Sequence, residues 1–109
     1  MTKLVFYDKE NDILSIHKTL SSDEKFKGNI DAGQFILDVS TKGRVFGIEV
    51  VNAIDFFQEF NVGKDILENL SSADFRVSVR PNGIIVGIVF KTKNQDIPAK
   101  IAVPLPREH

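Results

Sequence analysis

Hydrophobic and polar positions alternate at the start of the chain and predict a β-hairpin there. Two short apolar runs occupy residues 4–7 and 13–17, and the acidic and amide residues between them favour a turn. In the second run Leu14 and Ile16 face one side of the predicted sheet, whereas His17 faces the other. Residues 21–33 are polar and indicate a loop, with one short edge strand near residues 24–28 as an option.

The stretches 35–52 and 75–92 follow the same pattern of apolar strand, turn and apolar strand. In the first stretch Gly43 is suited to the left-handed conformation that closes a three-residue turn. In the second, the Pro81–Gly83 turn presets its first residue with proline, and Gly83 accepts a positive φ. Aligned with an offset of forty positions, Gly43 meets Gly83 and Gly47 meets Gly87. Two interpretations stay open: tight hairpins share these features in general, or the unit has been duplicated.

Residues between the two hairpins change to a helical spacing, and the chain ends on a proline-rich strand. Apolar residues recur every three or four positions over about residues 54–70, with Asn52 as a candidate N-cap. Gly63 divides this segment into two short helices. The prolines at 98, 104 and 106 place the last strand at the edge of a sheet.

These elements predict an α+β fold: an antiparallel β-sheet of successive hairpins with one helical segment, about 54–70, packed on a face. The length of 109 residues fits a single domain over 1–109. Within it we distinguish residues 1–70 from an added hairpin and edge strand over 74–106.

The second strand of each long hairpin is apolar on both sides, and both sides therefore need cover. One helical segment covers about one face, so the other requires a second sheet layer, a curl of the same sheet, or a partner chain. We expect a homodimer pressed together through sheet surface. Its possible interface residues are Phe46, Ile48, Val50, Ile84, Val86 and Ile88.

Gly47 and Gly87 lie inside these apolar strands, where glycine weakens a strand. Such a glycine marks a bulge, a bend or the close approach of another element. We expect close packing of the helix or a bend of the sheet at both positions. A ligand resting on the backbone is the alternative.

Composition narrows the function classes. The net charge is −1 and basic residues are scattered, so we expect binding neither to nucleic acid nor to a membrane surface. The chain has no cysteine, which removes disulfides, thiolate zinc sites and a cysteine nucleophile. The first residues have neither a signal-peptide pattern nor a membrane-spanning run, so we expect a cytoplasmic protein.

Few residues suggest chemistry. Asp38 and Glu49 are carboxylates inside apolar strands and the nearest approach to an acid–base pair. If facing residues of this hairpin sum to about 84, the two acids point to opposite faces and form no dyad. The acidic residues at 8–12 lack the glycine and glutamate of a calcium loop, and His17 has no second histidine at ligand spacing. We therefore expect no catalytic residues, no metal and no cofactor.

Two strings of the sequence resemble a family. "YDKENDILSI" from Tyr7 and "FILDVSTKGRVFGIEVVNA" from Phe35 are similar to domain of unknown function 2283, a small prokaryotic family, over about residues 5–54. The shared motifs are Tyr7-Asp8, Asp12-Ile13-Leu14, Leu37-Asp38, Gly43-Arg44-Val45, Gly47-Ile48-Glu49 and Asn52-Ala53. Ser15 departs from the aromatic residue often found there, and residues 74–109 add a region that short members lack.

The resemblance implies no enzyme and no established binding residues. Some members look like antitoxin partners of small ribonuclease-like toxins, which implies a protein-binding module with a partner encoded nearby. The sequence therefore favours a non-catalytic protein-interaction or structural module that self-associates. The alternative is a small-ligand-binding domain or minor enzyme with a site near Asp38 or Glu49.

Overall fold

The first five strands form one antiparallel sheet. The computed structural model describes residues 4–104, and in it the strands of this sheet have the order β1-β2-β5-β4-β3. They are β1 (Val5–Asp8), β2 (Ile13–His17), β3 (Phe26–Ala32), β4 (Phe35–Ser40) and β5 (Val45–Val51). Both predicted hairpins, β1–β2 and β4–β5, are present. The optional edge strand is also present as β3, which is longer than expected and pairs with β4.

The last three strands form a second antiparallel sheet in the order β6-β7-β8. They are β6 (Ser72–Arg80), β7 (Gly83–Lys91) and β8 (Asp96–Pro104). The proline-rich strand β8 lies at the edge, as predicted, because proline cannot donate to a second neighbour. Residues 105 and 106, which the prediction included in this strand, lie outside the described residues.

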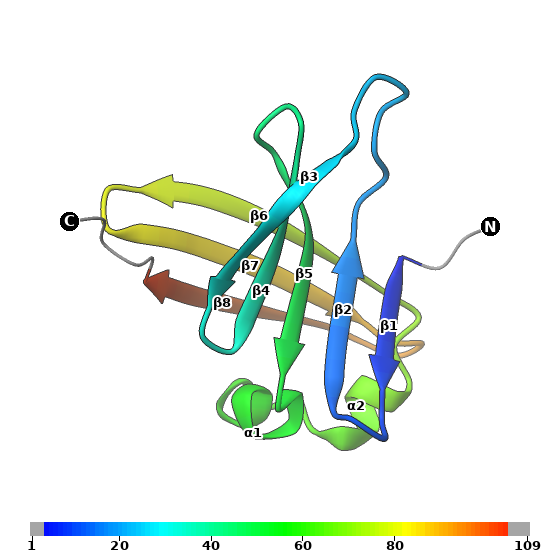
Figure 1. Ribbon diagram of the computed structural model, residues 1–109. Coiled ribbons are helices and arrows are strands. Elements are labelled where there is room, and N and C mark those ends of the chain that lie inside the picture. Colours follow the sequence, from blue (N-terminus) through cyan, green and yellow to red (C-terminus); the bar gives the residue numbers. More distant parts are fainter. Residues whose placement is uncertain (1–3, 105–109) are drawn as a thin grey trace.

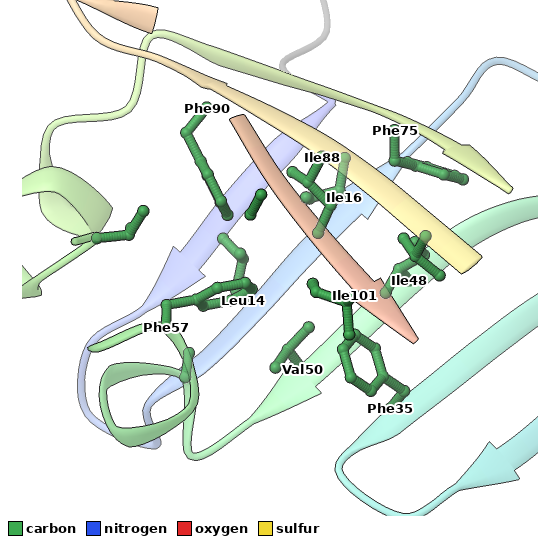
Figure 2. Close-up of a cluster of buried hydrophobic side chains, with 14 of the residues drawn as sticks. Leu14, Ile16, Phe35, Ile48, Val50, Phe57, Phe75, Ile88, Phe90 and Ile101 are labelled. Atoms are coloured by element: carbon green, nitrogen blue, oxygen red, sulfur yellow. The ribbon is translucent and has the colours of Figure 1, made fainter. Parts of the chain in front are cut away.

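The two sheets pack face to face, and their strands cross at a steep angle (Figure 1). Figure 2 shows side chains from both sheets pointing toward one another in the space between them. Leu14, Ile48 and Val50 come from the first sheet, and Phe75, Ile88 and Phe90 from the second; each is at most 1% exposed. The predicted α+β fold of antiparallel hairpins is confirmed. The hairpins are divided between two sheets, so the second layer of cover comes from this chain itself.

The helical segment consists of short pieces that close one end of the molecule below β1, β2 and β5 (Figure 1). The pieces are α1 (Ala53–Phe57), the 3₁₀ turn η1 (Gln58–Phe60) and α2 (Lys64–Glu68). Gly63 is the residue before α2, so it divides the segment as predicted. Phe57 and Leu67 anchor the pieces to the core.

The cap of α1 differs from the prediction. Asn52 occupies the N-cap position with φ 52°, but its side chain makes no capping hydrogen bond. The carboxylate of Asp12, in the β1–β2 turn, accepts from the backbone N–H of Ile54 at 3.1 Å. A distant acid therefore satisfies an N–H that the helix itself cannot, which ties α1 to the first hairpin.

Candidate functional site

The five-stranded sheet has one side that faces away from the core, which we call the outer face. Alternation along each strand assigns its residues, because the residues between them on the three central strands β2, β4 and β5 are core residues, such as Leu14, Leu37 and Ile48. Three rows of cross-strand partners define it. One row contains His17, Gly47, Asp38 and Asn29; the next contains Phe6, Ser15, Glu49, Ile36 and Asp31; the last contains Asp8, Ile13 and Val51.

A hydrogen-bonded group of three side chains crosses the outer face. Nε2 of His17 lies 3.1 Å from Oδ2 of Asp38, and Nδ2 of Asn29 donates to Oδ1 of Asp38 at 2.5 Å. This geometry suits a hydrogen bond in which the Nε2–H of His17 donates to the Asp38 carboxylate. Both oxygens of Asp38 are thus occupied, whereas the imidazole keeps 39% of its side chain exposed.

Gly47 lies directly beneath the His17 and Asp38 side chains. A Cβ added at Gly47 would lie 2.5 Å from Cδ2 of His17 and 2.6 Å from Oδ2 of Asp38. Only glycine therefore lets the two side chains meet across β5. The expected close approach at this mid-strand glycine is present, but it comes from two polar side chains rather than from the helix.

A β-bulge changes the register of the β4–β5 hairpin at this point. Val39 pairs with Val45, as the turn predicts, but Asp38 pairs with Gly47, which leaves Phe46 as the extra residue. The ring of Phe46 consequently lies near the outer-face rings of His17 and Phe26, with centroids 6.3 and 6.2 Å apart. The prediction that Phe46 shares a face with Ile48 and Val50 is therefore wrong.

The same bulge overturns the predicted placement of the two acids. Because the register is shifted by one residue beyond the turn, Glu49 pairs with Ile36, the outer-face neighbour of Asp38. Asp38 and Glu49 thus point to the same face as diagonal neighbours, not to opposite faces. Asp38 is engaged by His17 and Asn29, so the arrangement presents one hydrogen-bonded carboxylate and one half-buried carboxylate, that of Glu49.

The possible interface residues are now located. Ile48, Val50, Ile84, Val86 and Ile88 all belong to the core cluster and are at most 5% exposed. Their burial against the opposite sheet supplies the cover that we had assigned to a partner chain. Phe46, at 9% exposure, is the one member of the set on the outer face.

An ion pair between the buried carboxylate of Glu24 and the partly exposed guanidinium of Arg44 joins the β4–β5 turn to the preceding loop. Arg44 donates through Nη2 to Oε1 of Glu24 at 2.6 Å and through Nε to Oε2 at 3.0 Å. Ser40 and the backbone N–H of Ser21 also donate to the Glu24 carboxylate. The hydrogen bonds from Arg44, and then those from Ser40 and Ser21, hold the pKa of Glu24 well below its usual range. This cluster joins residues 19–25 to the hairpin and is structural.

A partly buried hydrogen bond explains the first family motif. The hydroxyl of Tyr7 donates to Oδ1 of Asp12 at 2.7 Å, the same carboxylate that caps α1. Burial, and then the hydrogen bond to Asp12, raise the pKa of Tyr7 above its usual range. Asp8 accepts from the backbone N–H groups of Glu10 and Asn11 and shapes the turn. Tyr7, Asp8 and Asp12 therefore shape the first hairpin and connect it to α1.

Sequence reasoning missed Asn29, Glu24 and Phe26. All three come from the polar stretch that looked like a loop, and their partners are nine or more residues away along the chain. The sequence offered one local sign of the Glu24 contact: Glu24 follows Ser21 by three residues, a spacing typical of a turn that begins at a serine.

Among residues 4–104 no cluster of three or more histidine, cysteine or acidic side chains could hold a metal ion. Within the same residues, no helix has the length and apolar character needed to cross a membrane.

Comparison with known proteins adds one finding. Residues 4–53 match the model of a family described as protein of unknown function (DUF2283). The match ends at the first residue of α1, so it covers the five-stranded sheet and none of the three-stranded sheet. No curated protein and no solved structure matches the chain.

Proposed function

We propose a function from the premise that the chain belongs, through residues 4–53, to the DUF2283 family of proteins of unknown function. The protein is a non-catalytic protein-interaction module that self-associates, and the outer face of its five-stranded sheet is the contact surface. The observation that carries the proposal is the set of large apolar side chains that this face exposes to water.

Three of the exposed large hydrophobic residues lie on the outer face. Phe6 is 65% exposed, Phe26 is 54% exposed and Leu4 is 41% exposed. Half-buried Ile36 shares the row of Phe6, and half-buried Ile13 and Val51 form the next row toward α1. Within residues 4–104 no further layer covers these side chains. Uncovered apolar side chains that share one face mark interaction surfaces, and phenylalanine contributes strongly when such a surface is buried.

The centre of the outer face suits a broad contact. Gly47 brings no side chain, and His17 and Asp38 lie across it in a fixed hydrogen-bonded arrangement. An ordered, shallow surface with aromatic residues near its margins fits another protein surface better than it fits a small molecule, which needs a concave site.

Glu49 sets the strength of this association. It lies half-buried on the central strand β5, between Ser15 and Ile36. A two-fold contact across this face brings two such carboxylates into a region of low dielectric, where like charges repel. The association is therefore weak, and replacing Glu49 with glutamine strengthens it.

Sedimentation equilibrium between low and high micromolar protein tests the proposal. The unaltered chain shows an average mass that rises with concentration, and Phe6→Ser or Phe26→Ser lowers that rise. Val79→Ser is the matched control, because Val79 is 78% exposed but belongs to the other sheet. A constant monomer mass at the highest concentration, or equal effects of all three variants, contradicts the proposal.

A further inference from the structure

The outer side of the three-stranded sheet contains a hollow of about 520 Å³ around Gly87. Gly87 lies in the middle of β7, and its cross-strand partners are Arg76 on β6 and Lys100 on β8. The floor is therefore backbone, with one cationic side chain on each flank. This surface lies outside the residues that match the family, and the five-stranded sheet contributes nothing to its lining.

Neither the backbone nor the packing around Gly87 requires glycine. Its φ lies outside the left-handed region, and a Cβ added there would meet no atom within 4 Å. Glycine is unfavourable in a strand interior relative to alanine. Its presence keeps the hollow open, and a larger residue would fill the space without a clash.

The walls combine apolar surface with unpaired charge. Ile85, Val89 and Pro98 supply the apolar part. Within residues 4–104, neither Arg76 nor Lys100 forms an ion pair with an acidic side chain. Asp74 is the one acid in the lining, one row away beside Val89 and Pro98.

The surrounding sheet strengthens the positive character of the hollow. Residues 72–104 contain five basic residues and two acidic ones, although the whole chain has a net charge of −1. The basic residues are Arg76, Arg80, Lys91, Lys93 and Lys100, and the acidic ones are Asp74 and Asp96. A field of this sign attracts acidic partners and repels a second copy of the same face.

We propose that this hollow binds an acidic segment of a partner protein. One apolar side chain of the segment lies over Gly87, between Ile85 and Val89, and neighbouring carboxylates of the segment pair with Arg76 and Lys100. This site goes beyond the self-association proposed above, because it uses the other sheet and a different kind of partner.

The shape of the hollow favours a protein segment over other anions. It is open on a sheet face, so it can hold one anchoring side chain while the rest of a segment continues across the sheet. Nucleic-acid binding surfaces combine positive charge with aromatic side chains on which bases stack. The side chains that line this hollow on its outward side are aliphatic or polar, and Phe75 is 1% exposed and belongs to the core.

The test is a titration of the ¹⁵N-labelled chain with short peptides, followed by NMR amide shifts. The probe is acetyl-Asp-Glu-Phe-Glu-Asp-amide. One control peptide has alanine in place of phenylalanine, and another has lysine in place of the acidic residues. A third control, phenylbutyrate, tests whether the hollow binds a small aromatic carboxylate. We expect the probe to shift amides of residues 74–78, 85–89 and 98–100, with a smaller response from the alanine peptide, none from the lysine peptide, and weaker binding at high salt.

Variants locate the site. Gly87→Val places a side chain where the apolar anchor of the probe should lie and weakens probe binding by about tenfold or more, the equivalent of one lost apolar anchor. Arg76→Gln weakens binding, Asp74→Asn strengthens it, and Arg80→Gln, which removes the same charge from the same strand outside the hollow, has a smaller effect. Thermal unfolding of each variant verifies that it is folded.

Three outcomes overturn the proposal: no shift with the acidic phenylalanine peptide at millimolar concentration, unchanged binding in Gly87→Val, or binding of phenylbutyrate without binding of the peptide. The last outcome assigns the hollow to a small molecule. Shifts confined to the five-stranded sheet would report on the self-association surface, so failure of one proposal is distinguishable from failure of the other.

Discussion

Hairpins β4–β5 and β6–β7 each place one glycine at the turn and another four residues later, and the structure uses these glycines differently. At the turns, Gly43 adopts φ +77°, whereas Gly83 is outside the left-handed region and lies under the backbone of β8. Inside the strands, Gly47 is covered by two side chains, whereas Gly87 opens onto the hollow. The predicted positive φ at Gly83 is thus wrong, since the Pro81-Asn82 turn closes without it.

The difference teaches that glycine meets two separate physical demands here, and that one of the four glycines meets neither. Gly43 supplies backbone conformation, Gly47 and Gly83 supply room for other atoms, and Gly87 meets neither demand. The registers diverge as well: β6–β7 pairs without interruption from Ser72 to Arg80, whereas β4–β5 contains a bulge. The two hairpins therefore differ in structure, although their sequences share the same turn glycine and the same alternation of apolar residues.

The largest loss of stability should come from breaking the Glu24–Arg44 ion pair, which stabilises only one of the two hairpins. Arg44 of the β4–β5 turn binds Glu24, whereas the aligned residue of the other hairpin, Ile84, lies in the core. We expect Glu24→Gln to lower the melting temperature more than any glycine variant below. The exposed pair Asp23–Lys42 is the control, and Asp23→Asn should change stability little.

Lowering the pH should also remove the stabilisation that the Glu24–Arg44 ion pair provides. Because the pKa of Glu24 is held below its ordinary value of 4.5, its contribution is complete above that pH and is lost as the pH falls further. The melting temperatures of the unaltered chain and Glu24→Gln should therefore differ most near neutral pH and converge in acid. A difference that stays constant down to strongly acidic pH would refute the assignment.

Gly83→Ala should have the next largest effect. The added Cβ would lie 2.4 Å from the carbonyl oxygen of Val103, and backbone atoms of a paired strand cannot rotate away. We expect a loss of about 2 kcal/mol or more in the free energy of unfolding, measured with urea. Hydrogen exchange should show the loss concentrated at the end of β8. A loss below that of Gly47→Ala would reverse the order proposed for these two sites.

Gly47→Ala should cost less, because side chains rather than backbone must yield. The new methyl group displaces His17 from Asp38, which removes a hydrogen bond worth about 1–2 kcal/mol. In a double-mutant cycle, Gly47→Ala should destabilise the His17→Ala variant much less than it destabilises the unaltered chain, because the crowding imidazole atoms are then absent. Additive effects of the two substitutions would show that Gly47 serves another purpose.

Gly87→Val should have the smallest effect on stability and sharpen the contrast between the two mid-strand glycines. Its Cβ enters open space and valine suits a strand, so we expect no loss and a gain of up to about 1 kcal/mol. Urea unfolding of Gly87→Val beside Gly47→Val measures the contrast directly. A clear destabilisation at position 87 would mean that the hollow is closed in solution.

Much of the fold follows from local pattern. The apolar alternation in β2, β5, β6 and β7, the left-handed Gly43 and the division of the helical segment at Gly63 each depend on neighbours within a few residues. The candidate sites do not. The His17–Asp38 pair spans 21 residues and the Glu24–Arg44 pair spans 20, and both meet through strand order that no local pattern specifies.

The sequence by itself determined where most strands, turns and helical turns form, because side-chain period and turn chemistry act over a few residues. Only the tertiary structure decided that the hairpins belong to two sheets, which buried five of the six expected interface residues inside one chain. It also decided the face of Asp38, Glu49 and Phe46, because a one-residue bulge inverts every assignment beyond it. Finally, it distinguished Gly47 and Gly83, which are crowded by atoms of other strands, from Gly87, whose Cβ position is open.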